Sequence, residues 1–168
     1  MRRVLDAFGY EKAVCLGHSM GCQVIYTFAH LFPERTAMLV PILGGFGRPV
    51  HTFLNAELPS LIGFLIGHKV TTLMPEFLLR GQRQMLGSTL GRSVASRLAR
   101  LSGIVSDTRM PQVDLDAYLD HFGSFAPLVF FRMAEKMAAH TAEPWLPDIE
   151  APTLVIAGEN DLFTPMHL

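Results

Sequence analysis

The sequence predicts an α/β fold: a mostly parallel sheet with a helical region inserted between two of its parts. Three observations support this fold class. Short aliphatic runs at 13–16, 37–43 and 153–157 have the length and composition of strands buried in a parallel sheet. A helical pattern joins the first two runs into a βαβ unit. Residues 44–145 read as helical, without the alternation of a half-buried strand.

The N-terminal residues predict the last turns of an amphipathic helix. Gly9 ends it, since glycine most readily takes the left-handed conformation that follows a helix. These residues lack the long apolar core of a secretory signal peptide, which favours the cytoplasm without identifying a compartment.

The two ends of the sequence predict an internal piece of a longer protein. The chain opens on a helix without a preceding strand and closes on the loop after residues 153–157. A parallel sheet of three strands could neither shield itself nor carry so long an insertion. The alternative is a small, self-sufficient helical domain with a residual sheet.

Residues 17–21, Gly-His-Ser-Met-Gly, form the most informative motif, because they lie between the first predicted strand and the helix after it. G-x-S-x-G in that setting is a nucleophile elbow, a sharp turn that raises the serine hydroxyl above the sheet. We expect Gly17 and Gly21 there because turn and helix approach too closely for a Cβ. Ser19 would then lie at a helix N-terminus, which stabilises developing negative charge. The alternative is an ordinary Gly-Ser turn.

The helix after this motif is expected from about residue 20 to residue 32, with Pro33 ending it. Later helices are expected over 60–65, 76–86, 92–105 and 115–140, the last of them broken near Pro127.

Composition excludes several classes of function. The net charge is −1, and no basic or acidic block favours nucleic acid or an anionic membrane surface. The two cysteines, Cys15 and Cys22, form no disulfide framework and are expected to be buried thiols. Neither C-x-x-C nor a histidine-rich metal spacing is present. We therefore expect no metal and no organic cofactor.

With Gly-His-Ser-Met-Gly between a strand and a helix, the chain resembles the α/β-hydrolase superfamily, in its serine esterase and lipase-like branch. Residues 151–165, Ala-Pro-Thr-Leu-Val-Ile-Ala-Gly-Glu-Asn-Asp-Leu-Phe-Thr-Pro, are similar to that family's late strand and acid-bearing loop. The resemblance implies Ser19 as nucleophile, Asp161 as the triad carboxylate and the Met20 N–H as an oxyanion donor. Glu159 lies in the same loop, but the Gly-x-x-Asp spacing favours Asp161.

The catalytic base is not apparent among the seven histidines. In this fold the triad follows the order Ser, acid, His. Six histidines precede Asp161, namely His18, His30, His51, His68, His121 and His140. His167 follows Asp161 but belongs to the same loop, whereas the family's base lies beyond a further helix and strand. We therefore expect the true histidine to lie outside this sequence, and this polypeptide to be inactive or nearly so.

The resemblance also implies a division of the chain. Residues 1–45 would be the first part of the hydrolase core, 46–145 a helical cap or lid, and 146–168 the second part of the core. The Leu, Met and Phe content of the cap favours an apolar acyl pocket over a sugar site. Leu58–Gly67 is a candidate contact with lipid, and it is too short to span a bilayer.

Two hypotheses of function follow. The first is a serine hydrolase that cleaves an ester or related acyl bond of an apolar small molecule through an acyl-enzyme. The same triad serves thioesterases, carbon–carbon bond hydrolases, perhydrolases and acyltransferases, so the leaving group stays open. The second is a non-catalytic protein of the same fold that binds an apolar ligand or a protein partner. The elbow and acid favour the first, and the missing histidine favours the second.

Overall fold

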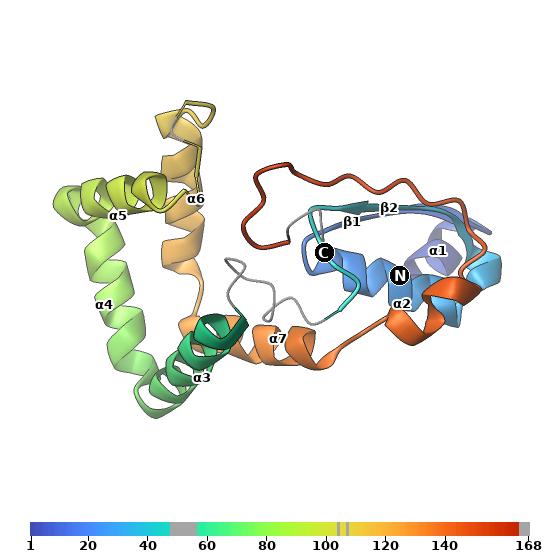
Figure 1. The fold of residues 1–168 in the computed structure, drawn as a ribbon, viewed down its shortest axis with the longest axis horizontal. Helices are drawn as coiled ribbons and strands as arrows, with labels where there is room; N and C mark the ends of the chain where they lie inside the picture. Colours follow the sequence, from blue (N-terminus) through green and yellow to red (C-terminus); the bar gives the residue numbers. More distant parts are fainter. Residues whose placement is uncertain (48–56, 104, 107, 165–168) are drawn as a thin grey trace. The chain divides into compact units, whose positions relative to one another are not determined.

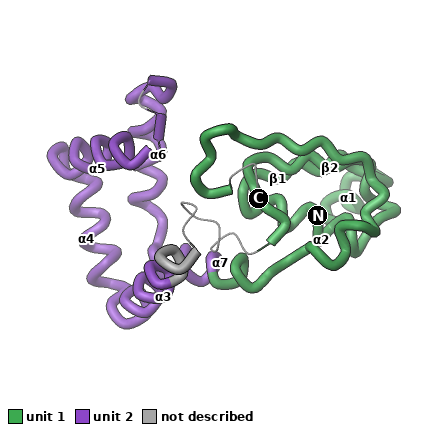
Figure 2. The backbone as a smooth tube through the Cα atoms, viewed as in Figure 1, with its two compact units in different colours: residues 1–61, 135–168 green, residues 62–134 purple. Residues whose placement is uncertain are grey.

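The computed structural model describes residues 1–47, 57–103, 105–106 and 108–164 (Figure 1). The chain forms two compact units, the first comprising residues 1–61 and 135–168 and the second residues 62–134 (Figure 2). The expected cap, 46–145, contains the whole second unit, and its assignment as a cap stays a proposal.

Helix α1 (Arg2–Phe8) opens the first unit and ends as expected at Gly9, whose φ is 72°. The Gly9 N–H donates to the Asp6 carbonyl at 3.2 Å, a hydrogen bond that this left-handed conformation allows. Arg35, just before the second strand, donates to the Asp6 carboxylate at 2.7 Å and so ties α1 to the sheet.

The sheet has two parallel strands, and a third extended segment is joined to it by isolated bridges. Strands β1 (Ala13–His18) and β2 (Thr36–Ile42) pair in parallel, with a register irregularity between Ala13 and Val14 and with His18 opposite Ile42. Residues 152–156, called here the edge segment, pair with the other side of β2 through parallel bridges from Leu39 to Thr153 and from Ile42 to Ile156. The three predicted strand regions are therefore all extended, and β2 lies between the other two.

One face of the sheet packs against α2 (Gly21–Leu31), as Figure 1 shows. The core between them contains Cys15, Cys22, Ile25, Phe28 and Leu39. Val14 and Leu16 point to the other face and are 53% and 64% exposed. The expectation of strands buried on both faces is thus wrong for β1, because no element within the described part of the chain covers these two side chains. It is also wrong for the edge segment, where Leu154, Val155 and Ile156 are exposed.

The remaining helices are α3 (Glu57–Leu73), α4 (Pro75–Gly87), α5 (Thr89–Leu101), α6 (Gln112–Ser124) and α7 (Pro127–Ala139). The expected break near Pro127 separates α6 from α7. Helix α5 ends four residues earlier than predicted, because Gly103 adopts a φ of 75°. Leu86, Leu115 and Leu119 form the core of the second unit. None of the described helices has both the length and the apolar character to cross a membrane.

The chain returns from α7 to the edge segment through η4 (Glu143–Asp148). This return pairs with the residues that follow β2: Gly47 and Thr141 form an antiparallel bridge, and the Ala142 N–H donates to the Phe46 carbonyl at 2.9 Å. The two stretches that lead into and out of the insertion are therefore held side by side.

Candidate active site

Ser19 follows β1 directly and has a φ of 54°, in the left-handed region that residues other than glycine rarely adopt. Such a conformation costs on the order of 1–3 kcal/mol and persists only where the surroundings hold it. Two hydrogen bonds do so: the Ser19 N–H donates to Ile42 O at 2.9 Å, and its carbonyl accepts from the Cys22 N–H at 3.0 Å. The side chain is exposed, as nucleophilic attack requires.

Close backbone approach explains one of the two motif glycines. A Cβ on Gly17 would lie 2.5 Å from the Gly21 carbonyl oxygen, so no side chain fits there. A Cβ on Gly21 would meet nothing within 4 Å, and the steric reason expected for Gly21 is therefore wrong. Gly21 contributes the carbonyl that excludes a side chain at position 17.

Gly44, which the sequence reasoning missed as part of the site, lies beneath the same turn. A Cβ there would overlap the Ser19 carbonyl oxygen and lie 2.6 Å from Cys22 Sγ. The only signal in the sequence is a Gly-Gly pair directly after a predicted strand, and it does not reveal which turn lies above it.

The Cys22 thiol ties the two strand ends together under the turn. Its Sγ donates to Gly17 O at 3.1 Å, and Ile42 O lies 3.5 Å away. Burial raises the pKa of the Cys22 thiol, so the thiol stays protonated and can donate to these carbonyls. Both cysteines are buried and free, as expected.

Met20 is the N-cap residue of α2. Within the described residues its N–H finds no backbone acceptor, and it lies at the positive end of the helix dipole. An N–H in this position can donate to an oxyanion that forms on a substrate bound at Ser19.

Asp161 lies in the loop after the edge segment, and the loop itself holds its carboxylate. Oδ1 accepts from the Phe163 N–H at 2.8 Å and from the Thr164 N–H at 3.1 Å, while Oδ2 accepts from the Thr164 hydroxyl at 2.7 Å. Partial burial acts to raise the pKa of Asp161, but these hydrogen bonds and the charge of His18 outweigh it and lower that pKa. The neighbouring Glu159 is exposed.

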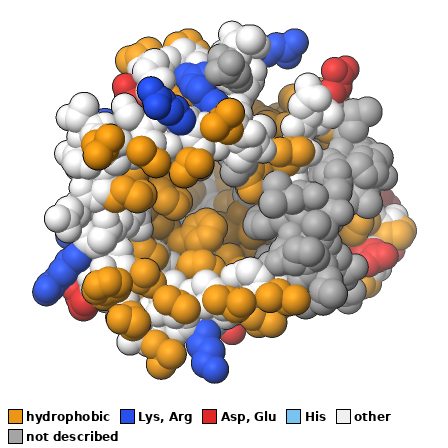
Figure 3. All heavy atoms as spheres, turned by 60° about the vertical axis from the view of Figure 1, so that its left-hand side comes forward, with side chains coloured by type: hydrophobic (Ala, Val, Ile, Leu, Met, Phe, Trp, Pro, Cys, Tyr) orange, Lys and Arg blue, Asp and Glu red, His pale blue; other side chains and the backbone are white. Residues whose placement is uncertain are grey.

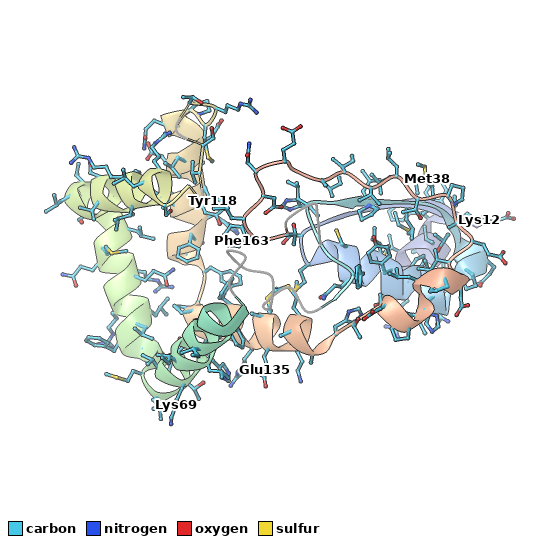
Figure 4. All side chains as sticks on the ribbon, viewed as in Figure 1. Lys12, Met38, Lys69, Tyr118, Glu135 and Phe163 are labelled. Atoms are coloured by element: carbon cyan, nitrogen blue, oxygen red, sulfur yellow. The ribbon has the colours of Figure 1, made fainter. Side chains whose placement is uncertain are left out.

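Ser19 follows the carboxyl end of β1, and Asp161 follows the carboxyl end of the edge segment. Because the strands are parallel, these ends lie on the same side of the sheet. The strand ends are joined in turn, since Ser19 N–H donates to Ile42 O and Leu43 N–H donates to Ile156 O, both at 2.9 Å. The strand residues that precede them, His18 and Ile156, are two strand spacings apart, about 10 Å between backbones. His18, next to Ser19, is close enough to act electrostatically on Asp161. Phe163, two residues after Asp161, lies at this end of the strands, and Lys12 lies at the opposite end (Figure 4).

A cavity of about 400 Å³ lies elsewhere, at the amino ends of the strands. Lys12, Thr36 and Pro152, which begin or precede the three strands, are among the residues that line it. The cavity lies at the opposite end of the strands from Ser19, so a molecule bound in it could not reach the serine hydroxyl.

The described histidines occupy three places. His18 is exposed beside Ser19, and its charge acts on Asp161. His30 and His140 contact Trp145, with ring centroids 4.1 and 5.9 Å away. His68 and His121 belong to the second unit, while His51 and His167 lie outside the described residues. In the described part of the first unit, no histidine hydrogen-bonds the Asp161 carboxylate.

Comparison with known protein families identifies proteins that are similar to this chain. A family model described as the alpha/beta hydrolase fold matches residues 1–168. The 2-hydroxy-6-oxononadienedioate/2-hydroxy-6-oxononatrienedioate hydrolase of Klebsiella pneumoniae is 29% identical over 167 residues, covering 99% of this chain and 52% of that protein. The protein of the same name from Cupriavidus pinatubonensis is 30% identical over 175 residues, covering 100% and 52%. The chain thus spans about half the length of these curated relatives.

Solved structures share the fold at lower sequence identity. An esterase from Exiguobacterium antarcticum matches with a TM-score of 0.62 and 12% identity, over 99% of this chain and 55% of the esterase. A thermophilic esterase from Thermogutta terrifontis matches with a TM-score of 0.59 and 20% identity, over 98% and 53%. These likenesses confirm the fold class predicted from the sequence.

Proposed function

This chain belongs to the alpha/beta hydrolase fold family, and from that premise we propose that it carries the nucleophile and the acid of a serine hydrolase. The observation that carries the proposal is that an exposed Ser19, in a left-handed backbone conformation, and Asp161 both follow the carboxyl ends of parallel strands. A binding pocket alone requires neither feature.

In the proposed reaction the Ser19 hydroxyl attacks a substrate carbonyl and passes its proton to a histidine. The Met20 N–H donates to the resulting oxyanion, and Asp161 holds the imidazole in the tautomer that accepts the proton. The histidine then protonates the leaving group, which leaves an acyl-enzyme on Ser19. Water activated by the same histidine releases the acid product.

The proposal assigns the base to a histidine outside these residues, so that this chain alone is inactive or nearly so. Two findings support this assignment. The chain spans about half the length of its curated relatives. His30 and His140, moreover, lie against Trp145 and hydrogen-bond neither Ser19 nor Asp161.

We propose an ester or related acyl bond in an apolar small molecule as the substrate. The esterases among the structural neighbours support the bond type. Apolar side chains exposed on the second unit support the apolar character, and Figure 3, in which the left-hand side of Figure 1 comes forward, shows hydrophobic side chains at the surface. Contact of these helices with a lipid surface belongs to the same proposal.

A second candidate substrate is an oxo-dienedioate, because the curated relatives are named as hydrolases of such compounds. It differs from an apolar ester in carrying two carboxylates. Turnover of p-nitrophenyl esters against turnover of a 2-hydroxy-6-oxo-dienedioate separates the two candidates.

Labelling with a fluorophosphonate probe tests the nucleophile. We would compare this chain with one extended into the downstream coding sequence, each with Ser19→Ala and with Ser124→Ala as a matched control on α6. Labelling of the extended chain that disappears only in Ser19→Ala is expected, with little labelling of the shorter chain. A folded extended chain that does not label would contradict the proposal and favour the non-catalytic binder.

A further inference from the structure

Thr164 makes two different hydrogen bonds to the Asp161 carboxylate. Its N–H donates to Oδ1 at 3.1 Å, and its hydroxyl donates to Oδ2 at 2.7 Å. The Phe163 N–H adds a second donor to Oδ1 at 2.8 Å. Thr164 is thus the one described residue that is hydrogen-bonded to both oxygens of this group.

The two oxygens differ in what they can still accept. A carboxylate oxygen offers about two acceptor directions. On Oδ1 both are used by backbone N–H groups, whereas on Oδ2 the Thr164 hydroxyl uses one and no other described residue donates to it. A further N–H donor can therefore bind well only at Oδ2.

We propose that Thr164 is a positioning residue, whose hydroxyl fixes the Asp161 carboxylate so that Oδ2 accepts the N–H of the catalytic imidazole. This inference rests on the proposed serine hydrolase function. Oδ1 accepts the backbone hydrogen bonds of the loop, and Oδ2 accepts the N–H of the catalytic imidazole.

The Thr164 hydroxyl fixes the plane of the Asp161 carboxylate, which the backbone donors on Oδ1 alone do not. The terminal torsion of an aspartate is broad, so donors on one oxygen leave the carboxylate plane free to turn. A short hydrogen bond from a hydroxyl to an ionised oxygen fixes the second oxygen as well. It also favours the charged form of the carboxylate, which must be ionised to stabilise the imidazolium.

The first test reads the carboxylate directly, without catalysis. The side-chain carboxyl carbon of Asp161 is followed by NMR against pH in the wild-type chain, Thr164→Val, Thr164→Ser and Thr153→Val. Thr153 is the matched control, because its hydroxyl donates to the Ala151 carbonyl on the same segment and not to the carboxylate. We expect the Asp161 titration to move to higher pH in Thr164→Val only. An unmoved titration in a folded Thr164→Val would overturn the inference.

The second test reads the reaction in the extended chain. Loss of a hydrogen bond to a charged group predicts a fall of about tenfold or more in kcat for Thr164→Val, with KM little changed. Thr164→Ser should restore most of the rate, and Thr153→Val should match wild type. Wild-type rates in Thr164→Val would overturn the positioning role while leaving the hydrolase proposal intact. An extended wild-type chain that does not label at Ser19 would overturn both.

Discussion

The backbone of Ser19 depends on residues that never touch a substrate. Its φ of 54° is held by Ile42 O on one side and the Cys22 N–H on the other, with Gly44 directly below. The turn is thus a three-way contact between the end of β1, the end of β2 and the first turn of α2. A change at any of these contacts alters where the hydroxyl points.

Gly44→Ala should therefore disturb the site more than its position outside the motif indicates. The added Cβ would overlap the Ser19 carbonyl, and overpacking of this kind destabilises by about 1–3 kcal/mol. We expect lower stability in denaturant unfolding and loss of fluorophosphonate labelling in the extended chain. Gly45→Ala is the matched control, because a Cβ there would be 3.8 Å from its nearest neighbour. Equal effects of the two substitutions would contradict this account.

The two motif glycines should respond in opposite directions to the same substitution. Gly17→Ala would place a Cβ 2.5 Å from the Gly21 carbonyl and should destabilise the first unit. Gly21→Ala meets open space in the first turn of α2, where alanine is favoured over glycine by up to about 1 kcal/mol. Chemical denaturation of the two variants measures the difference. A destabilised Gly21→Ala would show that the open space around Gly21 does not set its tolerance.

The motif made Ser19 and the Gly17 contact predictable from sequence, since both depend on residues within a few positions of each other. Gly44 was not predictable, because its role depends on the register that brings the end of β2 under the elbow. The loop after the edge segment is intermediate: spacing led to the proposal of Asp161 as the acid, but it could not predict that the Thr164 hydroxyl donates to the Asp161 carboxylate.

At the scale of elements, α2 holds the elbow at its N-terminus and the end of the insertion along its side. Gln23 Nε2 donates to Met137 O at 3.1 Å, at the end of α7. The Thr27 hydroxyl donates to Gln23 O at 2.7 Å and lies 2.9 Å from His140 Nε2. Since that hydroxyl's proton is already used, His140 must donate from Nε2, and within the described residues its buried Nδ1 has no hydrogen-bond partner.

Thr27→Val tests this attachment. It removes the acceptor of His140 Nε2–H and leaves both ring nitrogens unpaired, which should cost about 1–3 kcal/mol of unfolding free energy. Thr72→Val is the matched control, because the Thr72 hydroxyl is exposed on α3 and donates only within that helix, to His68 O. Urea unfolding of both variants gives the comparison. Similar losses would mean that threonine in a helix, and not the link to His140, sets the cost.

Periodicity predicted the types of the elements correctly, but it did not predict which of their faces are buried. Aliphatic composition identified β1, but it could not show that Val14 and Leu16 lie on a face left uncovered. Periodicity likewise identified helices in the insertion, and Pro127 the break between α6 and α7, but the end of α5 before Gly103 was not predicted. Burial depends on which elements pack together, and that information is not local.

At the scale of the whole molecule, the edge segment presents unpaired backbone. It pairs with β2 on one side, and no described strand lies on the other. Leu154, Val155 and Ile156 are all exposed along it. An exposed, apolar edge of this kind is a template for pairing with another chain. The chain should therefore associate through this edge as its concentration rises.

Val155→Lys tests whether the edge segment drives that association. Val155 is 63% exposed, so lysine adds charge to the edge without entering the core, and edge lysines oppose strand pairing. Light scattering across a concentration series should show less association than wild type. Val113→Lys on α6 is the matched control, since Val113 is 71% exposed but lies on a helix whose backbone is already paired. If Val113→Lys reduces association equally, general surface hydrophobicity and not the strand edge is responsible.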